Sequence, residues 1–107
     1  MEQMKTKDIT LPRLNNLKPT LESTAFKLME EAGELAQAIG KFRGMSGEQT
    51  SMNEQQVVKL ILDELLDVAQ TAVSLMFVLE EEYGADIGEA LQCHIQKLID
   101  KDYLRVE

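Results

Sequence analysis

The sequence predicts an all-α protein, an antiparallel helical bundle that is completed by homo-oligomerisation. Apolar residues recur at steps of three and four along much of the chain, which is the spacing of one helical face. Proline and glycine are scarce, with 2 and 6 in 107 residues, and several of them stand where a helix would begin or end. The longest predicted helix is apolar around most of its circumference, and such a helix is normally buried on several sides.

The chain begins with an arm, which a helix follows. Residues 1–18 contain Pro12 and are expected to form an N-terminal arm or a short helical turn. Pro19 and Thr20 can open the first helix, because proline is tolerated in a first turn and threonine can cap it. The helix is expected to end near Gly40 to Gly44. Its apolar positions share one face and are Leu21, Ala25, Leu28, Ala32, Leu35 and Ile39.

A loop and a long middle helix are predicted next. Residues 44–53 are rich in Gly, Ser, Thr and Asn, which is typical of a loop. Ser51 and Glu54 have the spacing of a capping box. The helix that they open is expected to reach about Tyr83, with Gly84 as its C-terminal stop.

A last helix is predicted from Ile87 to about Asp102, and Asp86 with Glu89 repeats the capping pattern at its start. A chain of this length suits one domain. We therefore expect a single domain over 1–107, made of the arm 1–18, a helix pair 19–83 and a C-terminal helix 86–102.

The middle helix is long for such a small chain. At 1.5 Å per residue it would extend about 45 Å, whereas a compact domain of this size has a radius of gyration of about 13 Å. Sixteen of the 23 residues from Val57 to Leu79 are apolar. Either the helix breaks or a second subunit covers it. The second subunit is the preferred interpretation, so a homodimer or homotetramer is expected.

The charge of the chain limits its partners. The formal net charge is −8, which disfavours nucleic acids and anionic membranes, because both bind positive surfaces. A transmembrane segment over 57–79 is disfavoured too, since each charge near a bilayer centre costs roughly 2.5–3.5 kcal/mol. That stretch holds Lys59, Asp63, Glu64 and Asp67. The single cysteine, Cys93, allows no disulfide within the chain and fits a reducing cytoplasm.

Two acidic clusters repeat one pattern, acid-acid-x-x-acid. The first is Glu30-Glu31-Ala32-Gly33-Glu34 and the second is Asp63-Glu64-Leu65-Leu66-Asp67. Residues three apart are neighbours on a helix surface, so each cluster presents two carboxylates side by side. If the two helices are antiparallel, four carboxylates can converge. Mg²⁺ takes oxygen ligands of this kind and often shares them with substrate phosphates.

A solvated-surface interpretation competes with the metal site. Acids at this spacing are common on exposed helices, and Lys27, four residues before Glu31, could form an ordinary ion pair. The solvated-surface interpretation suits Glu64 less well, because this residue shares its helical face with apolar residues. A buried acid needs a partner or a metal. Cys93 and His94 offer too few ligands for structural zinc, and Cys93 is expected in the core.

The stretch FKLMEEAGELAQAI followed by DELLDVAQTAVSL resembles the MazG-like branch of the all-α nucleoside triphosphate pyrophosphohydrolases. The resemblance covers about residues 20–83. It implies an enzyme that cleaves a ribo- or deoxynucleoside triphosphate to a monophosphate and pyrophosphate, and clearance of non-canonical nucleotides is a candidate role for this chain. It implies Mg²⁺ as the cofactor, with Mn²⁺ as a substitute. The residues it assigns as metal ligands and catalytic groups are Glu31, Glu34, Glu64 and Asp67.

The triphosphate also needs positive groups. If the last helix continues, Lys97, Lys101 and Arg105 lie four apart and align, and together with Lys27 they are the candidate substrate-binding residues. A basic helix end that complements the helix dipole is the competing interpretation. Two functional alternatives also stay open. One is a phosphoribosyl-ATP pyrophosphohydrolase or dUTPase-like enzyme of the same fold, and the other is a non-catalytic helical partner protein.

Overall fold

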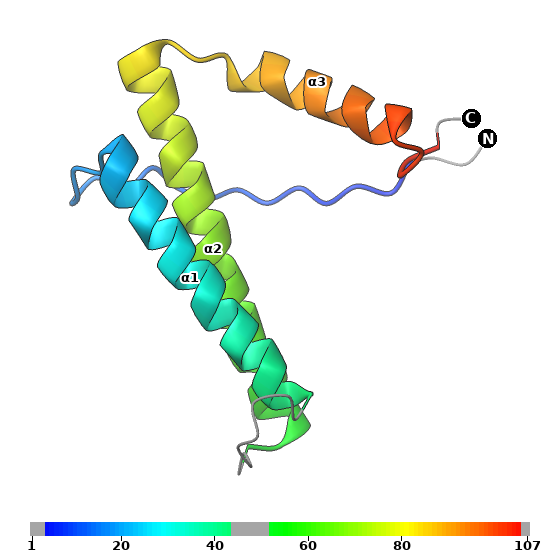
Figure 1. The fold of residues 1–107 in the computed structure, drawn as a ribbon. Coiled ribbons are helices and arrows are strands. Elements are labelled where there is room, and N and C mark those ends of the chain that lie inside the picture. Colours follow the sequence, from blue (N-terminus) through cyan, green and yellow to red (C-terminus); the bar gives the residue numbers. More distant parts are fainter. Residues whose placement is uncertain (1–3, 44–51, 106–107) are drawn as a thin grey trace.

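The computed structural model describes residues 4–43 and 52–105, which form three helices and no strand. They are α1 (Leu21–Phe42), α2 (Glu54–Tyr83) and α3 (Ile87–Asp100). Helices α1 and α2 run antiparallel, side by side, whereas α3 extends away from the end of α2 (Figure 1). The all-helical prediction is confirmed. None of the described helices combines the length and the apolar composition that crossing a membrane requires.

Reciprocal capping boxes lie at the start of the first two helices. The Thr20 side chain accepts a hydrogen bond from the Ser23 amide, and the Ser23 side chain caps Thr20 in return. Asn53 and Gln56 form the same reciprocal box at the start of α2. The predicted cap at Ser51 is therefore wrong as the start of α2, because the amide side chain two residues later satisfies the first amides. Ser51 itself and residues 44–50 of the predicted loop lie outside the described residues.

The ends of the later helices differ in how well the sequence predicts them. Gly84 stops α2 in the left-handed conformation, with φ of 67°, as expected. Asp86 caps α3 by accepting from the Glu89 amide. Helix α3 ends at Asp100, two residues before the expected end, because Lys101 caps it and Asp102 takes φ of 62°.

The contact between α1 and α2 is narrow. The buried residues of α1 are Thr24, Glu31 and Ala38, seven apart, rather than the predicted apolar face. Ala25 and Ala32 of that face are exposed. A single neighbouring helix covers only one stripe, and that stripe lies to one side of the apolar positions.

Helix α2 continues through 30 residues, so the alternative in which it breaks is wrong. The described chain measures 45 × 44 × 21 Å, with a radius of gyration of 17.2 Å, against about 13 Å for a compact domain of this length. Large apolar side chains stay exposed on both long helices, among them Phe26 and Met29, each 74% exposed, and Leu62 at 51%.

The N-terminal segment is an arm without a helical turn over residues 4–20. It is attached to α2 by two polar links. The Arg13 guanidinium forms two hydrogen bonds to the Glu81 carboxylate, of 2.6 and 2.7 Å. The Gln70 side-chain amide donates to the Pro12 carbonyl over 2.9 Å.

Candidate metal centre and adjoining pocket

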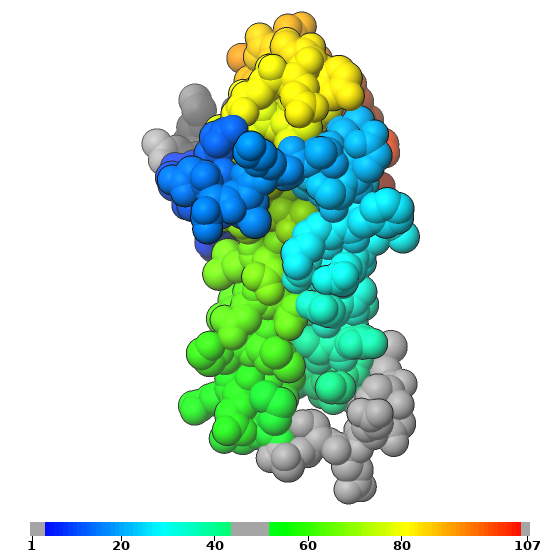
Figure 2. All heavy atoms as spheres, turned by 90° about the vertical axis from the view of Figure 1, so that its left-hand side faces the viewer, coloured from blue at the N-terminus to red at the C-terminus, as the bar shows by residue number. Residues whose placement is uncertain are grey.

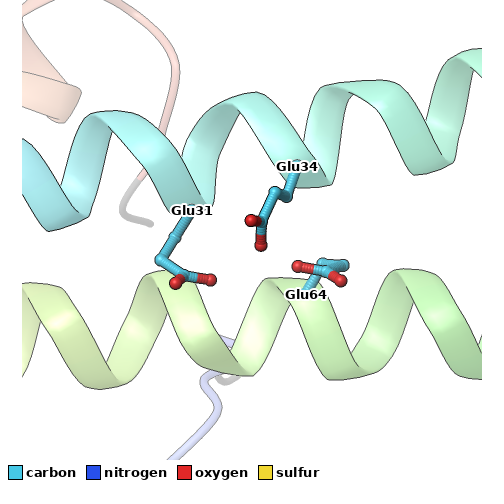
Figure 3. A group of neighbouring side chains, drawn as sticks. All are labelled: Glu31, Glu34 and Glu64. Carbon is cyan, nitrogen blue, oxygen red and sulfur yellow. The ribbon is translucent and has the colours of Figure 1, made fainter.

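Three carboxylates from two helices converge between α1 and α2. Glu31 and Glu34 stand one turn apart on α1, and Glu64 faces them from α2 (Figure 3). One oxygen of each lies within 4.8 Å of the others. The antiparallel pairing makes this possible, because it brings the acid-x-x-acid pattern of α1 beside the middle of α2.

Two oxygens of this cluster are buried and find no hydrogen-bond partner in the described part of the chain. Glu31 is 5% exposed, and its Oε1 accepts from the Lys27 ammonium at 3.0 Å. Its Oε2 and the Oε2 of Glu64 are buried and have no hydrogen-bond partner among the described residues. A buried carboxylate oxygen without a partner is costly. A hard divalent cation would supply the missing interaction for both, so the donor set fits such an ion.

The charges of the cluster act on one another. The negative charge of Glu31 raises the pKa of Glu34 above its ordinary value, and partial desolvation and the neighbouring carboxylate of Glu64 act in the same direction. The hydrogen bond to Glu31 raises the pKa of Lys27, and the charge of Glu31 adds to this. Like charges at this distance disfavour ionisation, and a bound cation would relieve the repulsion.

The other acids of the two sequence clusters lie differently. Asp67 is exposed and is not part of the close group, although it lines the same pocket as Glu31. Glu30 is exposed and pairs with Lys27 at 3.7 Å. Asp63 is exposed and pairs with Lys59 at 2.9 Å. The structure thus brings together three of the four predicted ligands and leaves the fourth at the pocket.

A cavity of about 500 Å³ adjoins the cluster and includes Glu31 and Asp67 in its lining. Three buried hydroxyl residues line it as well, Thr24, Thr71 and Ser74. Thr24 donates to the Thr20 carbonyl over 2.6 Å and Thr71 to the Asp67 carbonyl over 2.8 Å. Because their protons are committed to their own helices, these two hydroxyls have acceptor capacity left for a ligand.

Sequence reasoning missed this pocket. The signal available in α2 was Gln70, Thr71 and Ser74, which interrupt a run of apolar residues on a helix expected to be buried. Polar groups at interior positions need hydrogen-bond partners, so they indicate a site that is open to water or a ligand. The opposite wall is formed by the arm, whose position no local pattern reveals.

The predicted basic residues of the C-terminal region do not align. Helix α3 ends before Lys101. Lys97, Lys101 and Arg105 therefore do not lie along one face of a continuous helix, as the prediction required. Arg105 pairs instead with Asp102 at 3.8 Å. The Lys101 ammonium lies 5.9 Å from the centre of the Tyr103 ring. Of the four candidates, Lys27 is the one that lines the pocket beside the acids.

The expected core position of Cys93 is wrong, because the thiol is exposed. Helix α3 buries none of its residues against the rest of the described chain. His94 is exposed as well. Neither residue belongs to the acidic cluster.

Comparison with protein families matches residues 19–105 to the MazG nucleotide pyrophosphohydrolase domain. The matched range begins just before α1 and contains all three helices, the acidic cluster and Asp67. Comparisons with curated proteins and with solved structures found no match.

Proposed function

Because this chain belongs to the MazG nucleotide pyrophosphohydrolase domain family, we propose that it hydrolyses ribo- or deoxynucleoside triphosphates in a metal-dependent reaction. Water and the triphosphate give a nucleoside monophosphate and pyrophosphate. The oxygen of water bonds to phosphorus, the anhydride between the α and β phosphates breaks, and pyrophosphate leaves with the bridging oxygen. Clearance of non-canonical nucleotides is the physiological role that we favour.

The buried, unpartnered oxygens of Glu31 and Glu64 are the observation that carries this proposal. We assign Glu31, Glu34 and Glu64 as ligands of Mg²⁺, with Mn²⁺ as a substitute, and Asp67 as the fourth. When bound, the ion would clamp phosphate oxygens and lower the pKa of a bound water. Asp67 lines the pocket beside Glu31, and this position supports its assignment as a ligand where the triphosphate would meet the cluster.

Lys27 supplies positive charge at this point. Its ammonium contacts Glu31 at 3.0 Å, and its side chain lines the pocket. We propose that Lys27 offsets phosphate charge when the nucleotide is bound. The positions of Lys97, Lys101 and Arg105 within one chain do not support substrate binding at the site of the same chain. We propose instead that these residues serve the site of a second subunit.

A homo-oligomer is part of the proposal. The exposed apolar residues on α1 and α2 leave a surface that a second copy of the chain can bury at roughly 25 cal/mol per Å². Closed two-fold symmetry is the commonest arrangement of such copies. The same surface is the observation that favours the other function, a non-catalytic partner protein.

A nucleotide screen with Mg²⁺, read by pyrophosphate release, separates these functions. The panel includes canonical and modified triphosphates, dUTP and phosphoribosyl-ATP, so that the related enzymes of the same fold are tested together. We expect turnover that chelator abolishes, with monophosphate and pyrophosphate as the first products. Diphosphate and orthophosphate would contradict the assigned bond cleavage. Absence of both turnover and metal binding would favour the partner protein.

A further inference from the structure

The N-terminal arm forms part of the wall of the pocket beside the acidic cluster. Leu14, Leu17, Lys18 and Pro19 line the cavity on this side. In Figure 2 the blue segment lies over the upper part of α2 and reaches the beginning of α1. One side of the pocket is therefore formed by a segment that belongs to neither of the helices carrying the acids.

Two links fix the position of this wall. Arg13 and Glu81 form a bidentate pair, which adds geometric specificity to a charge-assisted bond. Gln70 donates to the Pro12 carbonyl over 2.9 Å and lies 3.5 Å from the Ser74 hydroxyl. Gln70 and Glu81 are roughly three turns apart on α2, so the two links hold adjacent arm residues at separate points along one helix.

Within the described chain, no further hydrogen bond joins this wall to α2. From residue 12 to residue 19, the hydrogen bonds that reach α2 are those of Pro12 and Arg13. Leu17 in the middle of the wall is 65% exposed. The wall is thus held at its start by these two links and at its end by continuity with α1.

A triphosphate bound at the acids would leave its nucleoside in this pocket. Glu31 and Asp67 line it, and a volume of about 500 Å³ is within the range for small-molecule sites. Leu14 and Leu17 offer apolar surface for a base, and the hydroxyls of α1 and α2 offer polar groups. The side chains that a base would meet on one side therefore come from the arm.

We propose that the segment from Pro12 to Pro19 is the wall that selects the nucleoside, and that Gln70, Arg13 and Glu81 are its positioning residues. This inference rests on the proposed function, since it takes the acids as the triphosphate site. Arg13 and Glu81 act through the wall, whereas Gln70 both holds the wall and lines the pocket itself. Loss of any of the three therefore changes recognition of the nucleoside and leaves binding of phosphate at the acids intact.

The test uses the full chain and variants Arg13→Gln, Glu81→Gln and Gln70→Leu. We expect KM for the preferred nucleotide to rise about tenfold, because small misplacements of a positioning group cost up to about a hundredfold. Discrimination between bases should fall, while the inhibition constant of inorganic pyrophosphate stays unchanged. The double variant Arg13→Glu with Glu81→Arg should restore KM. Lys59→Gln is the matched control, since it removes an exposed ion pair of α2 outside this pocket.

Unchanged KM and base preference in all three variants would overturn the proposal, and so would a parallel rise in the pyrophosphate constant. A second measurement keeps this result separate from the proposed function. If no nucleotide is turned over, calorimetry in chelator measures whether ribo- and deoxynucleoside monophosphates bind the pocket, and this measurement tests the wall on its own. Binding that Arg13→Gln weakens supports the wall. Absence of binding, or binding that Arg13→Gln leaves unchanged, overturns it. Helix content by circular dichroism identifies any variant that fails to fold, and the remaining two then decide.

Discussion

Glu31 of α1 and Glu64 of α2 each hold one carboxylate oxygen buried and without a hydrogen-bond partner in the described part of the chain. Their other neighbour in the cluster is Glu34, and each of the three contributes an oxygen within 4.8 Å of the others. Lys27 is the described cation that contacts the buried Glu31. One ammonium group leaves the cluster with excess negative charge, which is why we expect it to bind a cation.

Replacement of Glu64 by Gln should weaken Mg²⁺ and Mn²⁺ binding by at least about tenfold, since even groups that only support a metal ligand are worth about 10- to 100-fold. Calorimetry measures this directly. Asp63→Asn is the matched control, because it makes the same change on the same helix at an exposed residue paired with Lys59. Saturating metal should also stabilise the wild type, by about 2.7 kcal/mol at a hundred times Kd. Equal affinity in Glu64→Gln and Asp63→Asn would refute the site.

Removal of the charge of Glu34 should stabilise the metal-free protein at neutral pH. The pKa of Glu34 is raised in the folded state, chiefly by Glu31. Folding therefore favours the protonated acid, and this contribution to stability is lost as the pH rises through the folded pKa. Glu34→Gln should raise Tm in chelator at neutral pH and reduce the gain in Tm on adding Mg²⁺. A lower Tm in chelator would show that Glu34 makes a favourable contact instead.

The sequence predicted the helices well because their ends depend on local chemistry. Thr20 begins α1 and Gly84 ends α2 through bonds to residues a few positions away. The convergence of Glu31 with Glu64 could also be predicted from the sequence, since a repeated spacing on two helices requires only that they be antiparallel. The buried stripe of α1 could not be predicted, because its position depends on which side of α1 meets α2.

The sequence predicted the arm itself, but it did not predict where the arm packs, for a different reason. Arg13 and Glu81 are 68 residues apart, and neither belongs to a pattern that would pair one with the other. Gln70 likewise binds a backbone carbonyl, a group that every residue carries. Asp67 shows a further limit, because a spacing of three places it one turn from Glu64 but does not decide which way its carboxylate lies. The pocket therefore became visible only when the arm was placed.

The link between Arg13 and Glu81 should depend on pH in a defined direction. The hydrogen bond from Arg13 lowers the pKa of Glu81 below its ordinary value of 4.5. The pair therefore stabilises the folded chain above the unfolded pKa, and this contribution is lost as the pH falls through the folded pKa. Carbon-detected NMR of Glu81 measures the titration. In Arg13→Gln the pKa should return toward 4.5, and high salt should have a similar effect by screening this exposed pair. An identical titration in both proteins would mean that the link is absent in solution.

The last prediction concerns the exposed apolar stripe of α2, which consists of Val58, Leu62, Leu65 and Met76. These side chains are 41 to 51% exposed, and their successive spacings of four, three and eleven place them on one helical face. A second copy can bury this stripe, and each fully buried aliphatic side chain is worth about 1.5–3 kcal/mol. We expect light scattering to give at least twice the chain mass of 12.1 kDa.

Leu62→Glu and Leu65→Glu should each raise the dissociation constant of the oligomer about tenfold or more, since 1.4 kcal/mol is a factor of ten. Gln92→Glu on α3 is the control, because it adds the same charge at an exposed position outside the stripe. If the stripe is the interface, the two leucine variants dissociate at concentrations at which the control stays assembled. Their metal affinity should stay close to that of the wild type, because the acidic cluster is formed by α1 and α2 of one chain. A wild-type mass of 12.1 kDa at micromolar concentration, with full activity, would refute the oligomer, and three equally assembled variants would place its interface elsewhere.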